Sequence, residues 1–371
     1  MNPKGVAVLV AVLVALVTAS CSSGSGGATS STSEARAVAD PSCDGRDREA
    51  TTSERRRMMF DGEERQYQLS LPPAYDGSTP IPVILNLHGL TSDIEEQDMV
   101  SDLPEAGGER GYAIVTPQAL PVVLPIPGGS EPSNFWNITQ IFNPPTEAGS
   151  DSPGTTQVIE GASDDLGFLI AALDDVEQAI CVDTAREYVT GISNGAGMTM
   201  ALVCTNDRRF AAAAPVAGVN MGTICAATHA TSIIAFHGDA DPLVPYGGGD
   251  MFGYPLGLES VQERMGAAAA LADCDPDPEQ TSPSGDSTRL VWTCPDGYGM
   301  ELYTIKGGGH TWPGVTTYVD PSTTRATGTN GPRESPFDIE SIVGHQTTDI
   351  IATDLMLDFF DQHERVDGRE R

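Results

Sequence analysis

The chain has 371 residues, with 52 acidic and only 20 basic side chains, so its formal net charge is −32. A surface this acidic repels phosphate backbones and anionic lipid, so we expect no nucleic-acid partner and a substrate that is not strongly anionic. No cysteine–histidine cluster has the spacing of a zinc site, so we also expect no metal.

The N-terminus predicts export. One basic residue, Lys4, precedes an apolar run over residues 6–17, which is too short to cross a bilayer but suits a signal-peptide core. Small residues then lead to Cys21, so residues 1–21 are similar to a lipoprotein signal in which Cys21 is lipidated. An ordinary signal peptide cleaved nearby is the alternative. Membrane attachment is expected only through this lipid anchor.

The composition after Cys21 divides the remaining chain. Residues 22–45 are rich in Gly, Ser and Thr and predict a flexible tether. The folded domain should start near Cys43 or a little later and cover residues 46–365, with residues 366–371 as a polar tail.

An even number of cysteines remains after Cys21, which in an exported chain predicts disulfides. Cys274 and Cys294 flank a polar loop and form the expected local pair, and Cys204 with Cys225 is plausible. Other pairings stay open.

Alternating polar and apolar residues predict an edge or half-buried strand at residues 65–72. Short apolar runs that stop at Gly or Pro predict further strands at 81–89, 112–118, 187–191, 210–218 and 231–238. Helical stretches lie between and after them, at 162–180, after Ser193, at 258–272 and at 347–363, the first with Ser163 as the expected N-cap. This alternation predicts an α/β fold, a mostly parallel sheet with helices on both faces. Functional residues of such sheets gather at the carboxyl ends of the strands.

Ser193 is the candidate nucleophile. It stands in Gly191-Ile-Ser-Asn-Gly195, a pattern that is weak alone but that here follows a predicted strand and precedes a helix. Gly191, Gly195 and Gly197 would allow strand and helix to approach closely in a sharp turn. Ser193 therefore has the position of a nucleophile elbow.

A serine hydroxyl needs a neighbouring base, and His310 is the best candidate. It lies in a glycine-rich loop directly after an apparent strand at residues 300–306, whereas the rival His345 precedes the last helix. His88 and His237 each precede a glycine at a strand end, so we expect them to organise loops.

The acid and the oxyanion donors complete the expected site. Asp241 and Asp239 both follow a buried strand, in the order Ser–Asp–His of the α/β-hydrolases; either could be a turn aspartate, and we favour Asp241, which lies deeper in the loop. Backbone N–H groups of Asn194, after the nucleophile, and Leu90, after an early strand, are the expected oxyanion donors.

Six runs of the sequence carry a family resemblance: LHGLTSD, YVTGISNGAGMTMALVC, FAAAAPVAG, HGDADPLVPYGG, GGGHTWPG and TTDIIATDLMLDFF. Spread over residues 65–362, they resemble the polyhydroxybutyrate-depolymerase-like esterases, a group that includes feruloyl and acetylxylan esterases. The resemblance implies an α/β-hydrolase fold and a serine esterase with Ser193, Asp241 and His310 as its triad. It also implies that residues 133–137 and 163–168 lie near the substrate cleft.

The combined prediction is an exported serine esterase that forms an acyl-enzyme, needs no cofactor and hydrolyses short hydroxyalkanoate esters or oligomers. Feruloyl or acetyl esters of plant polysaccharide are the first alternative, and a cell-envelope acyltransferase or an inactive binding protein on a hydrolase scaffold is the second. Trp136 and Trp312 are candidate aromatic walls for the substrate, although Trp136 equally suits loop packing. Residues 316–344 are either a lid or an inert loop.

Overall fold

The computed structural model of the protein describes residues 43–46, 52–123, 132–138, 163–205, 208–222, 230–251, 254–315 and 344–365. The chain divides into two units, Met1–Ala37 and Val38–Arg371, and all described residues belong to the second. The expected signal peptide with Cys21, most of the expected tether, the polar tail and all but the last residue of the 316–344 segment lie outside these ranges. Within the described ranges, no helix has the length and apolarity to span a bilayer.

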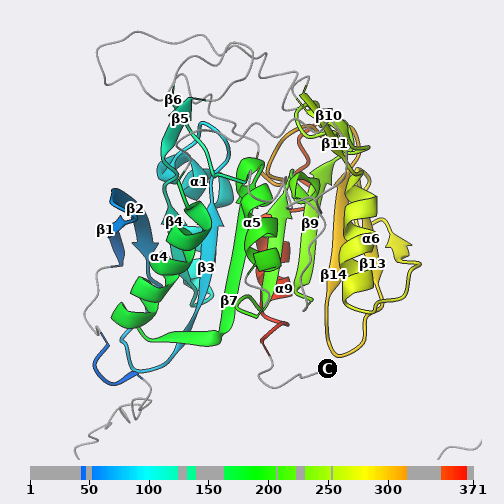
Figure 1. Ribbon diagram of the computed structural model, residues 1–371. Helices are drawn as coiled ribbons and strands as arrows, with labels where there is room; N and C mark the ends of the chain where they lie inside the picture. The colour runs from blue at the N-terminus through cyan, green and yellow to red at the C-terminus, as the bar shows by residue number, and fades with distance from the viewer. Residues whose placement is uncertain are drawn as a thin grey trace, which may run out of the picture. The chain divides into compact units, whose positions relative to one another are not determined.

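A sheet of ten strands forms the centre of the described structure (Figure 1). In spatial order its strands are β1 (Ser53–Phe60), β2 (Glu63–Ser70), β4 (Ala113–Pro117), β3 (Ile81–Leu87), β7 (Val182–Ile192), β8 (Ala212–Val216), β9 (Ser232–Gly238), β14 (Met300–Ile305), β13 (Ser287–Trp292) and β12 (Glu279–Thr281). The six strands from β4 to β14 are mutually parallel, and antiparallel strands flank them at both ends. The predicted mostly parallel sheet is therefore confirmed, while β1, β12 and β13 were not predicted.

Two short hairpins complete the strands: β5 (Pro121–Val123) with β6 (Pro132–Asn134), and β10 (Gly249–Met251) with β11 (Tyr254–Leu258). Both lie at the end of the molecule toward which the parallel strands run (Figure 1). The hairpins thus border the carboxyl edge of the sheet.

Helices cover both faces of the sheet, as predicted (Figure 1). One face carries α4 (Asp165–Ala179), α5 (Asn194–Thr205) and α6 (Val261–Leu271), whose apolar residues form one core with the sheet. The other carries α2 (Leu103–Glu109) and α9 (Ala352–Phe360), which contribute to a second core, and α1 (Ile94–Ser101) lies beside β3 and β4. Each fully buried Leu or Phe in these cores contributes about 1.5–3 kcal/mol.

The N-cap of helix α4 lies one residue later than predicted. Its N-cap is Asp164, whose side chain accepts from Gly167 N at 3.0 Å, so the prediction of Ser163 as the cap is wrong. Aspartate caps a helix as well as serine does, and the Ser163 hydroxyl instead donates to Asp165 at 2.8 Å.

Two disulfides join pairs of described cysteines, one over a short and one over a long separation in the sequence. Cys274–Cys294 confirms the predicted local pair, whereas Cys43–Cys181, which joins residues 138 apart, was not predicted. Cys204 is also disulfide-bonded, but Cys225, its predicted partner, lies outside the described residues. Since Cys43 is buried and cross-linked, the folded unit includes it, at the early end of the expected start.

Removal of the Cys43–Cys181 bridge should lower the free energy of unfolding more than removal of Cys274–Cys294. The two bridges close loops of 138 and 20 residues, and loop-closure entropy favours the longer one by about 2 kcal/mol. Urea unfolding of the two double Cys→Ala variants, followed by tryptophan fluorescence, measures this difference. An equal or larger loss from the short-loop variant contradicts it.

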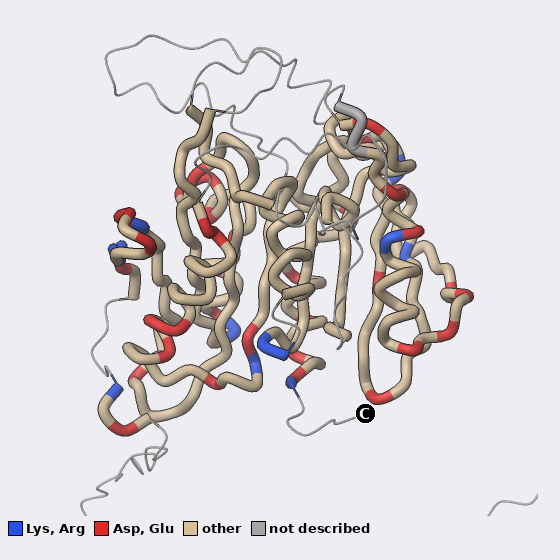
Figure 2. Tube along the Cα trace, viewed as in Figure 1, with Lys and Arg blue, Asp and Glu red and all other residues tan. Residues whose placement is uncertain are grey.

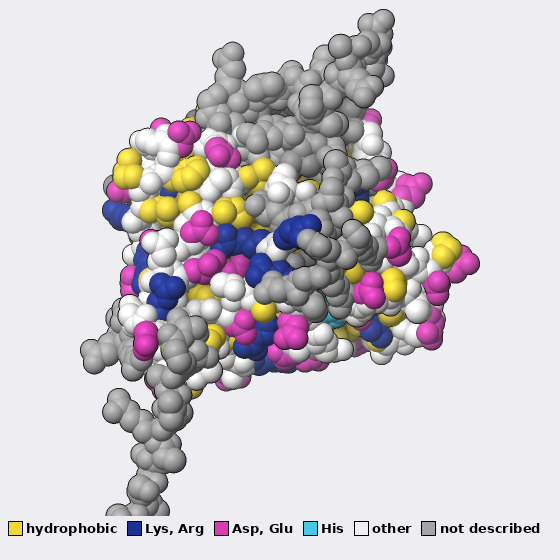
Figure 3. Space-filling view, turned by 60° about the horizontal axis from the view of Figure 1, so that its bottom comes forward, with side chains coloured by type: hydrophobic (Ala, Val, Ile, Leu, Met, Phe, Trp, Pro, Cys, Tyr) yellow, Lys and Arg dark blue, Asp and Glu magenta, His cyan; other side chains and the backbone are white. Residues whose placement is uncertain are grey.

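Acidic positions recur along the described trace and outnumber basic ones (Figure 2). Basic side chains gather among acidic ones on the face that carries the amino ends of the parallel strands (Figure 3). There Arg209 pairs with Asp174, Glu177 and Glu187, and Arg110 pairs with Asp358 at 2.5 Å. Exposed pairs such as Arg110–Asp358 contribute only about 0–1 kcal/mol each, so they neutralise charge more than they stabilise the fold.

Candidate active site

Ser193 occupies the sharp turn between β7 and α5. Its φ is +58°, in the left-handed region that disfavours any residue with a Cβ, and its N–H donates to Val216 O at 2.9 Å. Strained backbone of this kind persists only where its surroundings enforce it. A half-buried serine in this conformation at the end of a central strand has the geometry of a nucleophile elbow.

The glycines beside Ser193 allow three backbone segments to meet. A Cβ at Gly191 would lie 2.7 Å from Leu87 O and from Gly195 O, and one at Gly195 would lie 2.6 Å from His88 O. Neither position has room for a side chain. The expected reason for these glycines, close approach of strand and helix, is confirmed, and the end of β3 takes part in it.

Asp241 and His310 follow β9 and β14, which are neighbours in the sheet. The imidazole Nδ1 of His310 donates to Asp241 Oδ2 at 2.7 Å. The two loops are tightly packed, because a Cβ at Gly238 would overlap the backbone of Gly308. The fold therefore brings together an acid and a base that stand 69 positions apart in the sequence.

The Asp241 carboxylate is buried and fully hydrogen-bonded. Its Oδ1 accepts from Leu243 N at 2.8 Å and from Val244 N at 2.9 Å. Burial alone would raise the pKa of Asp241, but the attraction of His310 and the hydrogen bonds from His237 and His310 outweigh it and hold the pKa well below its usual range. An ionised Asp241 keeps a proton on Nδ1 of His310 and leaves the opposite nitrogen, Nε2, able to accept another.

The rival acid and base have other partners. Asp239 is exposed and accepts from Gly307 N at 2.6 Å, which makes it a turn aspartate. His345 lies 2.8 Å from Asp286 with 47% of its side chain exposed. The structure thus pairs His310 with Asp241, and it does not bring His345 or Asp239 into that pair.

A second histidine, His237, reaches the same carboxylate. Its Nε2 lies 2.9 Å from Val244 O and 3.4 Å from Asp241 Oδ2, and the ring is 1% exposed and edge-on to Tyr246. We expected His237 only to organise a loop. His237 lies near the end of β9, four residues before Asp241, and this short spacing was the signal in the sequence for the contact.

The loop after β3 lies against Ser193. A Cβ at Gly89 would make ordinary contact, 3.6 Å, with Ser193 Cβ, and Leu90 beside it is half-buried. Asn194 is the first residue of α5, so its N–H has no carbonyl four residues back within the helix. Both expected oxyanion donors thus belong to backbone beside the serine.

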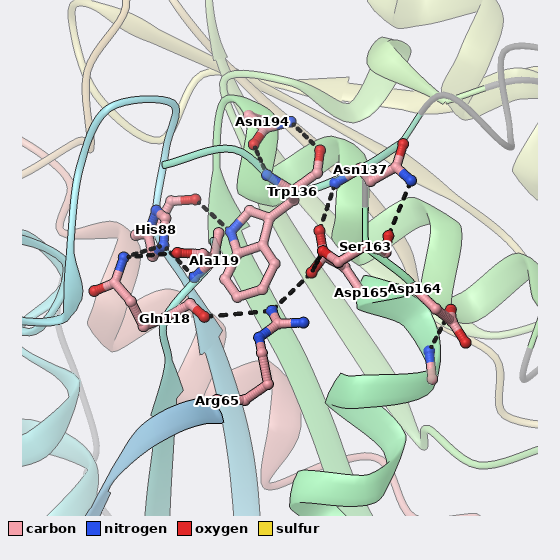
Figure 4. A network of polar contacts seen from close by, with 11 residues as sticks. Arg65, His88, Gln118, Ala119, Trp136, Asn137, Ser163, Asp164, Asp165 and Asn194 are labelled. Carbon is pink, nitrogen blue, oxygen red and sulfur yellow. Dashed lines mark hydrogen bonds and ion pairs between the residues drawn. The ribbon is translucent and has the colours of Figure 1, made fainter. Parts of the chain in front are cut away.

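His88 organises this loop, as expected. Its Nδ1 donates to Gly89 O at 2.7 Å, and its Nε2 accepts from Ala119 N at 3.1 Å (Figure 4). Burial lowers the pKa of His88 to about 4, so the ring stays neutral and both hydrogen bonds persist at neutral pH.

The prediction of Trp136 and Trp312 as aromatic walls is wrong. Trp136 is fully buried with its indole N–H on His88 O at 2.9 Å, and Trp312 is 2% exposed with its indole N–H on Thr353 Oγ1 at 3.0 Å. A substrate wall must expose its ring. For Trp136 the alternative interpretation, loop packing, agrees with the structure.

The carboxyl group of Asp98, in α1, contacts polar side chains of β3 and β4. Asp98 Oδ1 accepts from Thr116 Oγ1 at 2.5 Å and lies 3.4 Å from Asn86 Nδ2, and burial raises the pKa of Asp98 to about 6. The folded protein therefore holds this proton more tightly than the unfolded chain does.

The free energy of unfolding should fall as the pH rises from about 4, where Asp98 of the unfolded chain titrates, to about 6. The shift corresponds to a loss of about 3 kcal/mol, which Asp98→Asn should remove. Urea unfolding of both proteins between pH 4 and pH 7 measures the effect. Parallel curves for the two proteins would contradict it.

Several known proteins that are similar to this chain are named esterases. No protein-family model matches the chain. The putative esterase NocK of Nocardia uniformis subsp. tsuyamanensis is 28% identical over 75% of this chain and 79% of its own length. Feruloyl esterase B of Piromyces equi is 25% identical over 66% of this chain, and feruloyl esterase C of Emericella nidulans is 26% identical over 50%. The matches span 42% and 58% of these two feruloyl esterases, about half of their length.

Among solved structures, an acetyl xylan esterase from Aspergillus awamori superposes with a TM-score of 0.44 and 16% identity, over 70% of this chain and 94% of its own.

The class of the chain follows from its own architecture. A mostly parallel sheet with a serine turn after β7, an aspartate after β9 and a histidine after β14, in that chain order, defines an α/β-hydrolase. Within that class the chain is similar in sequence to feruloyl esterases over part of their length.

Proposed function

We propose that the protein is an exported serine esterase that hydrolyses carboxylic esters, with Ser193 as nucleophile, His310 as base and Asp241 as the acid that orients it. The observation that carries the proposal is the 2.7 Å hydrogen bond between His310 Nδ1 and the buried Asp241 carboxylate. This pair lies at the carboxyl edge of the sheet, where Ser193 follows β7 in a strained turn. A positioned imidazole–carboxylate pair beside such a serine supports acyl transfer.

The proposed reaction proceeds through an acyl-enzyme. His310 Nε2 takes the Ser193 proton while the serine oxygen attacks the ester carbonyl, and the N–H groups of Leu90 and Asn194 stabilise the oxyanion. The ester C–O bond then breaks, and His310 returns the proton to the leaving alcohol. A water molecule, deprotonated by His310, attacks the acyl-enzyme; the acyl–oxygen bond breaks, His310 returns the proton to the Ser193 oxygen, and the carboxylic acid is released. No cofactor takes part.

The acyl group is the point on which two candidates differ. The named relatives favour a feruloyl ester, and the resemblance of the sequence to depolymerase-like esterases favours a short hydroxyalkanoate ester or oligomer. Turnover of methyl ferulate, p-nitrophenyl acetate and a hydroxybutyrate dimer by the purified protein separates them. A kcat/KM at least tenfold higher for methyl ferulate than for the hydroxybutyrate dimer assigns a feruloyl substrate, and the reverse ratio assigns a hydroxyalkanoate substrate.

Reaction of the purified protein with a fluorophosphonate probe tests the proposed chemistry itself. We expect stoichiometric labelling that a p-nitrophenyl ester competes away, and a peptide map that places the label on Ser193. Absence of labelling would favour the inactive scaffold. Ester products that increase with added alcohol would favour the acyltransferase.

Export is part of the proposal and has separate support. Disulfides such as Cys43–Cys181 and Cys274–Cys294 form and persist in oxidising compartments, and the N-terminal sequence is similar to an export signal. Mass spectrometry of the mature N-terminus from a native-type host would show whether cleavage occurs before a lipidated Cys21.

A further inference from the structure

A short segment, Asn134–Asn137, lies between the nucleophile turn and the loop after β3 (Figure 4). It begins at the last residue of the short strand β6 and is joined by hydrogen bonds to both parts of the proposed site. Any role of this segment in catalysis rests on the proposed function, because the segment contacts the backbone that carries the proposed oxyanion donors.

One side of the segment binds Asn194. The Asn194 side chain accepts from Trp136 N at 2.7 Å and donates to Trp136 O at 3.0 Å, and it is 2% exposed (Figure 4). A primary amide that pairs with both polar groups of one residue has its rotation fixed. Asn194 is thus held at the residue whose own N–H is one proposed donor.

The other side of the segment binds the loop that carries Leu90. The Trp136 indole donates to His88 O at 2.9 Å, and its ring lies 4.9 Å from the His88 ring, centroid to centroid. Asn134 accepts from Thr91 N at 2.9 Å through its carbonyl and donates to Ser92 O at 2.8 Å through its side chain. These bonds hold the chain on both sides of Leu90, the second proposed donor.

The segment is itself fixed to the body of the protein. Asn137 N donates to Asp165 Oδ2 at 2.8 Å, and Asp165 pairs with Arg65 at 2.7 Å, with both of these side chains essentially unexposed (Figure 4). The Arg65 guanidinium also stacks 3.8 Å from the centre of the Phe168 ring. A buried, hydrogen-bonded ion pair of this kind gives the segment a defined position on β2 and α4.

We propose that Trp136 is a positioning residue that sets the separation between the N–H groups of Leu90 and Asn194. Oxyanion donors act only when they lie within about 2.7–3.1 Å of the developing charge, and a displacement of about 1 Å costs on the order of 100-fold in rate. Trp136 is hydrogen-bonded to both sides, by its backbone to Asn194 and by its indole to His88 O. Its buried ring therefore acts through the backbone and does not touch substrate.

The test is Trp136→Phe, which keeps an aromatic ring but deletes the indole N–H. We expect kcat to fall about 10- to 100-fold with KM within about twofold, because ground-state binding does not use the oxyanion site. The inhibition constant of an alkylboronic acid, which forms a tetrahedral adduct with the serine, should rise by the same factor. The pH dependence of kcat should keep its shape, since the His310–Asp241 pair is not changed.

Trp292→Phe, which alters another buried tryptophan, in β13, is the matched control and should leave kcat and boronate affinity unchanged. Asn134→Ala, which removes only the bond to Ser92 O, provides a milder change if Trp136→Phe does not fold, and it should shift kcat and boronate affinity in the same direction. Loss of thermal stability with unchanged kcat and boronate affinity in the folded variants would overturn the proposal. A wild-type protein without fluorophosphonate labelling or ester turnover would instead overturn the proposed function.

Discussion

Ser193→Ala should remove ester hydrolysis almost completely, with kcat reduced on the order of 10⁶-fold. The Ser193 hydroxyl is the nucleophile of the proposed mechanism and the source of the proton that His310 takes, so without it no acyl-enzyme can form. Alanine keeps the same Cβ at φ +58°, so the strain of the turn and the stability of the fold should change little. Hydrolysis of p-nitrophenyl acetate and fluorophosphonate labelling measure the effect.

A matched control keeps this experiment specific. Ser78→Ala changes a serine in the turn before β3, where its hydroxyl bonds to Asp76, and should retain full activity. Equal thermal melting of the two variants and the wild type would show that the loss is chemical. Substantial esterase activity in Ser193→Ala would remove the basis of the proposed mechanism.

Asp241→Asn should reduce kcat on the order of 10⁴-fold while the protein stays folded. The two backbone donors, Leu243 N and Val244 N, require an oxygen at the position of Oδ1, so the new NH₂ group must take the place of Oδ2. There it faces Nδ1 of His310, and two donors cannot pair. The imidazole then carries its proton on Nε2 and cannot accept the one from Ser193.

The adjacent acid provides the comparison. Asp239→Asn keeps an oxygen that can accept from Gly307 N, and Asp239 lies outside the His310–Asp241 pair, so kcat should stay within about twofold. We expect KM to be similar in both variants. A fall of less than tenfold in Asp241→Asn would contradict the role of Asp241 as the orienting acid.

Local patterns were sufficient to predict the strands that carry the site. The apolar run that ends at Gly238, and the glycine spacing around Ser193, reflect backbone approach that only glycine permits. Because parallel strands place their carboxyl ends at one edge, the positions of His310 and Asp241 in loops directly after predicted strands favoured their pairing.

Long-range partners could not be predicted in the same way. Nothing in the residues near Cys43 indicates Cys181, and nothing near Arg65 indicates Asp165, 100 positions away. The two interpretations of Trp136, substrate wall and loop packing, could not be separated because a tryptophan near a cleft and a tryptophan under one share the same sequence signal. Only the burial of the ring and the partner of its indole distinguish the two.

The Cys43–Cys181 bridge also bears on how the enzyme would be presented to large substrates. Cys181 directly precedes β7, and Ser193 directly follows it, so the cross-link and the serine lie at opposite ends of one strand of eleven residues, about 35 Å long. Any support attached upstream of Cys43 would join the domain at the end of β7 opposite to Ser193. The attachment point itself would then not block the approach of a polymeric substrate to Ser193.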